Sequence, residues 1–273
     1  MSVQSDSLSD RLTIRLEVLP GKTVREKVEM ASQCGFDGIA FPGRFRSQFG
    51  EEMLASLADL PIPIETVSLG FEGSLCSPDP ALRQECRDSL LELFDFTAQL
   101  GAKSVNLPPV LILDNPERFP IGAIQEQDQL LIEQLPRLGD EAQARGVELL
   151  IEPVNAAETD YLTTIEHAAR LCEAVNHPAV GLTPDFFHMH IEESDIPSAI
   201  RNSMPWIRHI HTAEVMHRHE PMPGKLNHRP GFRALKDAGY TGLVEVECRS
   251  LSGPAEEVLP RAVAFLCEEW ALA

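Results

Sequence analysis

The amino-acid sequence predicts an α/β protein, a (β/α)8 TIM barrel in which eight parallel strands alternate with eight helices. Three observations support this fold class. Short apolar runs rich in β-branched residues alternate with longer amphipathic segments along the chain. The length of 273 residues is close to the roughly 250 residues of one such barrel. No Gly-x-Gly-x-x-Gly turn follows the first apolar run, which disfavours the alternative of an open, doubly wound sheet.

The eight predicted strands are short and almost continuously apolar. This pattern is typical of a parallel sheet that is covered on both faces. The predicted strands are Leu12–Leu19, Gly38–Phe41, Ile64–Leu69, Ser104–Leu107, Val147–Ile151, Val180–Thr183, Ile207–His211 and Leu243–Glu247.

Each strand is followed by a segment with apolar residues at helical spacing. In the first of these segments, Val24, Val28 and Ala31 recur at intervals that place them on one helix face. The predicted helices are Thr23–Cys34, Glu51–Leu60, Ala81–Leu100, Ile124–Arg145, Ile165–Val175, Ile196–Asn202, Pro230–Ala238 and Pro254–Trp270.

The chain has no linker and no change of composition that would mark a domain boundary. Residues 1–10, MSVQSDSLSD, are polar and acidic and lack the apolar core of a signal peptide. We therefore expect a disordered N-terminal segment over residues 1–10 and one barrel domain over residues 11–273.

Charge and cysteine content restrict the partners. A formal net charge of -19 disfavours binding to nucleic acid or to an anionic membrane, and no apolar run approaches the roughly 18 residues of a membrane helix. The six cysteines form no Cys-x-x-Cys pair, which is typical of free thiols in a reducing compartment. We expect a cytoplasmic protein that acts on a small molecule; a homo-oligomer is compatible with this.

Four residues with metal-ligating side chains end the last four predicted strands: Glu152, Asp185, His211 and Glu247. Each of them alone could be a salt-bridged or solvated loop residue. Together they end consecutive strands, whose carboxyl ends form the active-site face of a barrel. Glu245 faces the same side of its strand as Glu247 but lies deeper, so the later glutamate is the expected ligand. Carboxylates with one imidazole suit a divalent cation such as Mn²⁺, Mg²⁺ or Co²⁺ better than Zn²⁺.

The four residues lie in the segments IEPVNAAET, LTPDFFHMHIEE, IRHIHTAE and GYTGLVEVE. These segments resemble the sugar isomerase/epimerase family with the xylose-isomerase-like barrel, which includes D-tagatose 3-epimerase, ribulose-phosphate 3-epimerase and hydroxypyruvate isomerase. The resemblance covers about residues 147–250 strongly, and the first half mainly in its strand–helix rhythm.

The resemblance implies roles for individual residues. Glu152, Asp185, His211 and Glu247 would bind one divalent metal ion, and the two glutamates would also be the acid/base pair. Contacts to the substrate would come from His188, Arg218, Glu158 and Asn155.

This sequence departs from the family pattern at three positions, of which Ala156 and Leu226 lie near the expected substrate. Ala40 stands where the family usually has Glu, Ala156 where relatives often have Arg, and Leu226 where the Pro-Gly-x-Gly loop has Gly. The substrate is therefore less well defined than the metal site.

The residue set suits proton transfer next to a carbonyl group. A divalent metal stabilises the enediolate that forms when the proton leaves. Two carboxylates on opposite faces of a sugar can then remove one proton and return another. We therefore expect a metal-dependent isomerase or epimerase of a ketose or keto-sugar.

Three alternatives use the same barrel. A lyase or dehydratase acting on a keto-sugar, a cyclitol or dehydroshikimate would need the same metal and base. A phosphodiesterase for damaged DNA is suggested by His217-Arg218-His219-Glu220, which resembles a stretch of the related apurinic endonucleases. It would need further histidines at the ends of strands three and four, and the net charge disfavours it. A binding protein without activity would leave the ligand set without a purpose.

The loop between His211 and Arg233 is a positive island with a local charge of +2. Barrels often bind phosphate near strands seven and eight, which would favour a sugar phosphate. However, a carboxylate-rich metal site needs compensating charge whatever the substrate, and the turn after strand eight has no glycine-rich phosphate nest. We therefore expect an unphosphorylated substrate. The charges in question are Arg218, Lys225, Arg229 and Arg233 against Glu214 and Glu220.

Overall fold

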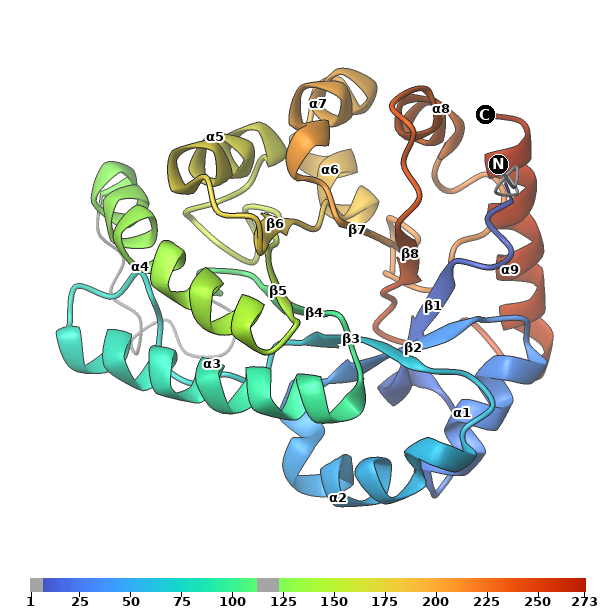
Figure 1. Cartoon of the computed structure of the whole chain (residues 1–273). Coiled ribbons are helices and arrows are strands. Elements are labelled where there is room, and N and C mark those ends of the chain that lie inside the picture. Colours follow the sequence, from blue (N-terminus) through green and yellow to red (C-terminus); the bar gives the residue numbers. More distant parts are fainter. Residues whose placement is uncertain (1–6, 112–122) are drawn as a thin grey trace, which may run out of the picture.

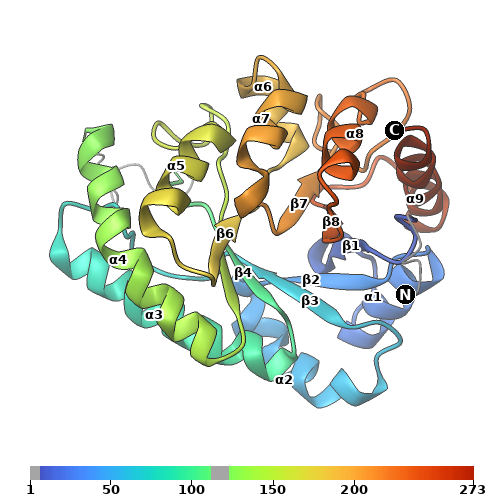
Figure 2. The same cartoon turned by 45° about the horizontal axis from the view of Figure 1, so that its top comes forward.

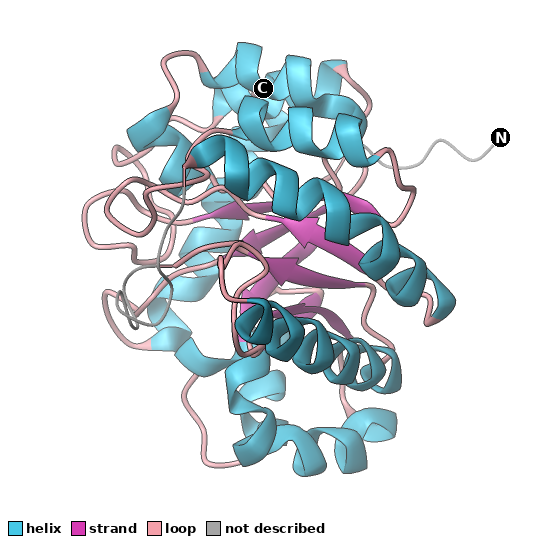
Figure 3. Ribbon diagram, turned by 90° about the vertical axis from the view of Figure 1, so that its left-hand side faces the viewer, coloured by secondary structure: helices cyan, strands magenta, loops and turns pink. Residues whose placement is uncertain are grey.

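A computed structural model describes residues 7–111 and 123–273 and confirms the predicted barrel. Eight parallel strands lie in the middle of the molecule, and helices surround them (Figures 1 and 3). The sheet order is β6-β5-β4-β3-β2-β1-β8-β7. The strands are β1 Leu12–Arg15, β2 Gly38–Pro42, β3 Ile64–Ser68, β4 Ser104–Leu107, β5 Glu148–Ile151, β6 Val180–Leu182, β7 His209–Thr212 and β8 Leu243–Val246.

The barrel is nearly closed between β6 and β7. Two isolated parallel bridges join this edge, Leu182 with Ile207 and Asp185 with His211. The second bridge brings two of the predicted metal ligands side by side at the carboxyl ends of their strands.

Helices α1 to α9 cover the outside of the barrel, and α7 lies between α5 and α8 (Figure 2). Local signals explain several of the starts. Thr23 and Glu26 form a capping box at α1, and Asp79 caps α3 in front of Pro80. The helices are α1 Val24–Gln33, α2 Arg46–Ser56, α3 Pro80–Leu100, α4 Ile124–Ala144, α5 Ile165–Val175, α6 Phe186–Glu192, α7 Ile196–Ser203, α8 Arg229–Asp237 and α9 Ala255–Ala271.

The structure corrects three of the predicted elements. The strand predicted over Leu12–Leu19 ends at Arg15, and a 3-10 turn over Leu16–Val18 follows it. Helix α2 begins at Arg46 rather than Glu51. The short helix α6 was not predicted, because the Pro-Asp sequence at its start is typical of a turn. In the structure, the Asp185 carboxylate caps this helix by accepting a hydrogen bond from the Phe187 N–H at 2.9 Å.

The barrel interior is more polar than its strand sequences indicate. On β1, Leu12 and Ile14 belong to the apolar core, while Thr13 and Arg15 alternate with them and are also buried. Hydrogen bonds link buried polar side chains across the barrel, such as Thr66 on β3 with Glu245 on β8 at 3.1 Å. The core therefore lies between strands and helices, and the interior supports a polar site.

The start of the described chain packs onto the barrel. Residues 1–6 of the predicted disordered segment lie outside the described residues, whereas Leu8 is buried and its carbonyl accepts from the Arg11 N–H at 3.1 Å. Within the described ranges, no helix is both long enough and apolar enough to cross a membrane.

Candidate active site

The structure brings the four predicted ligand residues together at the carboxyl ends of β5 to β8. One ligand atom from each of Glu152, Asp185, His211 and Glu247 lies within 4.8 Å of the others. All four side chains are buried. We refer to these residues as the four-residue cluster.

Backbone hydrogen bonds extend the strand ladders past the strand ends and fix the cluster. The Glu152 N–H donates to the Leu107 carbonyl at 3.0 Å, and the Glu247 N–H donates to the Thr212 carbonyl at 2.9 Å. The His211 N–H donates to the Pro184 carbonyl at 2.9 Å. Each of these side chains therefore leaves a rigid part of the barrel rather than a free loop.

Electrostatic coupling within the cluster is strong. The His211 Nδ1 lies 3.0 Å from Glu152 Oε1 and 3.6 Å from Glu247 Oε2. Burial, and after it the Glu247 charge, raise the pKa of Glu152 above its ordinary value. Burial also raises the pKa of Glu247, but Arg218, His211 and Arg15 outweigh it and bring this pKa below its ordinary value. The two glutamates thus have opposite tendencies to hold a proton.

Arg218 connects the cluster to the predicted substrate-binding residues. Its Nη2 donates to Asp185 Oδ2 at 3.0 Å and also to Glu247 Oε2, and its Nη1 donates to Glu158 Oε1 at 3.3 Å. The guanidinium lies over the Phe187 ring, 4.7 Å from its centroid. One arginine therefore neutralises part of the charge of three carboxylates.

A tight loop after β7 directs Arg218 into the site. The Glu214 carboxylate accepts from the Met216 and His217 N–H groups at 2.8 and 2.7 Å. Arg218 itself has a φ of 54°, in the left-handed region that non-glycine residues adopt uncommonly. Its carbonyl accepts from the Arg249 N–H at 2.8 Å, which ties this loop to the loop after β8.

His188 presents one defined nitrogen to the site. Its Nδ1 accepts from the Asn155 backbone N–H at 3.0 Å, so the ring proton lies on Nε2. This Nε2 is 3.5 Å from Asp185 Oδ2 and is buried without a hydrogen-bond partner among the described residues. Burial and, second, the Arg218 charge lower the pKa of His188 to about 2. A neutral imidazole with a free N–H suits a contact to a substrate oxygen.

A pocket of about 410 Å³ opens above the cluster. We call it the barrel-mouth pocket. It includes the predicted residues Glu152, Glu158, His188, Arg218 and Glu247. Its further lining residues are Arg15, Glu17, Arg44, Leu69, Pro108, Leu111, Val154, Cys248 and Arg249. Asn155, the remaining predicted substrate contact, is not one of these lining residues, and its side chain contacts His188 and Glu158.

Sequence reasoning missed three arginines of the barrel-mouth pocket. Arg15 donates to Glu247 Oε1 at 3.2 Å, and Arg249 donates to Glu158 Oε1 at 2.8 Å. Arg44 contacts Glu17 Oε1 at 3.3 Å. Two charged residues within the apolar run Leu12–Leu19, Arg15 and Glu17, were the available signal, and it does not extend to Arg44 or Arg249.

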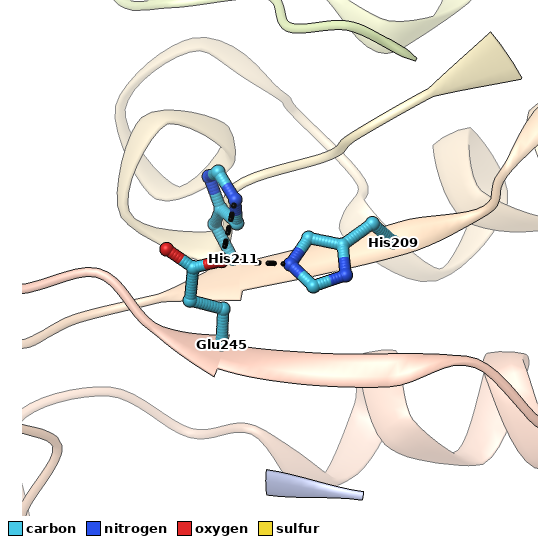
Figure 4. A group of neighbouring side chains, drawn as sticks. All are labelled: His209, His211 and Glu245. Atoms are coloured by element: carbon cyan, nitrogen blue, oxygen red, sulfur yellow. Dashed lines mark hydrogen bonds and ion pairs between the residues drawn. The ribbon is translucent and has the colours of Figure 1, made fainter. Parts of the chain in front are cut away.

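A second polar group lies deeper in the barrel, below His211. The buried Glu245 carboxylate accepts from Thr66 Oγ1 at 3.1 Å and pairs with His209 Nε2 at 2.9 Å. Figure 4 shows its carboxylate between the rings of His209 and His211. His209 is buried in this group.

The four-residue cluster fits a divalent cation. It offers three carboxylates and one imidazole nitrogen at one point, in surroundings where uncompensated negative charge is costly. Thiolate ligands, which structural zinc sites favour, are not part of it. The donor set therefore agrees with the hard or borderline cation predicted from the strand ends.

The fold and this site define a parallel α/β barrel with a candidate metal site at the carboxyl ends of its strands. The family model of the xylose isomerase-like TIM barrel matches residues 28–269, and the chain belongs to this family.

Individual proteins of known name or structure share 21 to 28% sequence identity with this chain in the following comparisons. The 3-dehydro-D-guloside 4-epimerase of Escherichia coli (strain K12) is 24% identical over 248 residues, which are 90% of this chain and 94% of the relative. The ketose 3-epimerase of Arthrobacter globiformis is 28% identical over 250 residues, 91% of this chain and 85% of the relative. The structure of D-allulose 3-epimerase from Methylomonas sp. in complex with D-allulose matches with a TM-score of 0.83 at 21% identity, covering 95% of this chain and 96% of that chain.

Proposed function

We propose that this protein is a divalent-metal-dependent isomerase or epimerase that acts on a ketose or keto-sugar through an enediolate. The observation that carries the proposal is the placement of Glu152 and Glu247 in one pocket, with Asp185 and His211 completing a possible cation site. The epimerases among the relatives support the reaction class.

The proposed metal ligands are the four residues of the cluster, and Mn²⁺, Mg²⁺ and Co²⁺ are the cations that suit them. When bound, such a cation polarises a carbonyl group and stabilises the negative charge that develops beside it. The remaining chemistry belongs to side chains of this chain.

Glu152 and Glu247 are the proposed acid/base pair. They follow β5 and β8, strands that are not neighbours in the sheet, and so reach the pocket from different directions. One carboxylate removes the proton next to the carbonyl, and the other returns a proton to the same carbon from the opposite face. For an aldose–ketose isomerisation, the proton returns to the neighbouring carbon instead.

Arg218, His188 and Glu158 are the proposed substrate-binding residues. The His188 Nε2–H and the Arg218 guanidinium can donate to sugar oxygens, while Glu158 can accept from a hydroxyl group. Asn155 holds His188 in its orientation. Positioning of this kind keeps the reacting carbon within reach of both glutamates.

The test is deuterium exchange. The purified protein is loaded with Mn²⁺, incubated in D₂O with a panel of ketoses, and freed of the metal before the sugars are analysed by NMR. The proposal predicts deuterium next to the carbonyl carbon of at least one ketose, together with its epimer or aldose. Loss of water from the sugar would identify the lyase alternative instead. No exchange with any ketose, in protein shown to bind Mn²⁺, would contradict the proposal.

A further inference from the structure

The carboxylate of Glu245 lies at the centre of the deeper polar group and contacts side chains from two other strands. Its Oε2 is 2.9 Å from His209 Nε2, 3.1 Å from Thr66 Oγ1 and 3.4 Å from His211 Nε2. Figure 4 shows the two imidazoles directed at this one carboxylate. The side chain is fully buried and does not line the barrel-mouth pocket. Glu245 therefore cannot act on a substrate in that pocket directly.

A cation at the four-residue cluster would determine which nitrogen of His211 carries a proton. Nδ1 faces the four-residue cluster and, as a ligand, would give its lone pair to a bound cation, so the ring proton would then lie on Nε2. This Nε2 lies 3.4 Å from Glu245 Oε2 and has no hydrogen-bond partner among the described residues. The other ring nitrogen, Nδ1, faces Glu152 Oε1 and Glu247 Oε2.

Both histidines of β7 depend on the same carboxylate. His209 and His211 are two residues apart on one strand, so their side chains point to the same face of the sheet. Their rings lie 5.0 Å apart, nearly perpendicular to each other. A change at Glu245 would therefore release the orientation of two neighbouring imidazoles at once.

We propose that Glu245 is a positioning residue that holds the proton of His211 on Nε2 and thereby directs Nδ1 toward the cation held by the four-residue cluster. This inference rests on the proposed metal-dependent function. A carboxylate behind a metal-ligating histidine fixes the ring and makes it a better ligand, and its loss typically lowers metal affinity about 10- to 100-fold.

The first experiment compares Mn²⁺ affinity by titration, with free Mn²⁺ measured by electron paramagnetic resonance. Glu245→Gln retains the size of the side chain but removes its charge, and it should weaken Mn²⁺ binding about 10- to 100-fold. Glu148→Gln is the matched control: it neutralises a half-buried carboxylate on β5 whose closest ion pair is Arg208 at 3.6 Å. Its affinity should equal that of the wild type. Equal affinity in a folded Glu245→Gln variant would overturn the proposal.

The second experiment needs no variant of Glu245. Protein labelled with ¹⁵N-histidine and loaded with diamagnetic Mg²⁺ is analysed by long-range ¹H–¹⁵N correlation, which identifies the protonated ring nitrogen. The proposal predicts a proton on Nε2 of both His209 and His211. A proton on His211 Nδ1 in the loaded protein would overturn it, even if Glu245→Gln does not fold.

The two proposals can fail separately. If the wild type binds no divalent cation at the four-residue cluster, the proposed metal-dependent function fails, and the role of Glu245 fails with it. If the wild type binds Mn²⁺ and Glu245→Gln binds it equally well, only the role of Glu245 is wrong.

Discussion

The Nδ1 atom of His211 lies 3.0 Å from Oε1 of Glu152, although β7 and β5 are separated by β6 in the barrel. The nearly closed sheet brings residues 59 positions apart in the chain into direct contact. The carboxylates of Glu152, Asp185 and Glu247 concentrate negative charge beside the His211 ring, which favours a cation there.

Neutralising either proposed acid/base residue should stop turnover. Glu152→Gln and Glu247→Gln remove a proton carrier and one ligand charge, so deuterium exchange should fall at least about 100-fold. Circular dichroism should show an intact fold, and Glu148→Gln should retain activity. Near-normal exchange in either variant would exclude the two-carboxylate mechanism.

Removing Arg218 should destabilise the metal-free protein. Arg218→Ala leaves Asp185, Glu247 and Glu158 without a shared counter-ion, and loss of one partner from a buried ion pair costs about 3 kcal/mol of unfolding free energy. Urea denaturation in EDTA measures this loss, and added Mn²⁺ should reduce it.

The control for this prediction is Arg208→Ala. Arg208 forms a partly exposed pair with Glu148, and such pairs contribute at most about 1 kcal/mol. An Arg218→Ala protein as stable as Arg208→Ala in EDTA would show that the cluster does not need the arginine as counter-ion.

Inorganic phosphate should not inhibit the enzyme. Arg229 is paired with Glu269 at 2.8 Å, and Lys225 and Arg229 line a separate surface pocket rather than the barrel-mouth pocket. Exchange rates in 10 mM phosphate, an amount on the order of a typical KM or above, should match those in its absence. Strong inhibition that disappears in Lys225→Ala and Arg229→Ala would instead indicate a sugar phosphate.

His228 should make the fold less stable in mild acid. Burial lowers its pKa to about 4, whereas an unfolded histidine titrates near 6.5. Between about pH 6.5 and pH 4, the unfolded chain therefore takes up a proton that the folded protein does not, and stability is lost as the pH falls. The loss attributable to this residue is about 3 kcal/mol.

The variant that checks this prediction is His228→Phe, because His228 packs among Phe186, Phe232 and Phe265. The free energy of unfolding, measured from pH 7 to pH 4, should fall less steeply in the variant than in the wild type. Equal slopes would show that His228 is not the responsible group.

The sequence was sufficient to predict the fold and the positions of the four-residue cluster. Regular strand–helix units place residues at strand ends by register alone, and Glu152, Asp185, His211 and Glu247 each lie at or just past the carboxyl end of a strand. Their roles as ligands and as acid/base pair stay predictions.

Other features depend on contacts that periodicity does not encode. Arg249 reaches Glu158 from a loop whose path is set by tertiary packing. The pairing of Glu245 with Thr66 joins strands that are far apart in sequence. Thr and Ser occur within short strands that are otherwise apolar, and Thr is common in strands of any kind. The sequence therefore did not predict the polar interior of the barrel.

The measurement that tests the central claim most directly is anomalous X-ray scattering from a crystal soaked with Mn²⁺. The account predicts one strong anomalous peak in contact with Glu152, Asp185, His211 and Glu247. A Mn²⁺ ion bound elsewhere while these four side chains remain without one, or carboxylates that point away from one another, would contradict it.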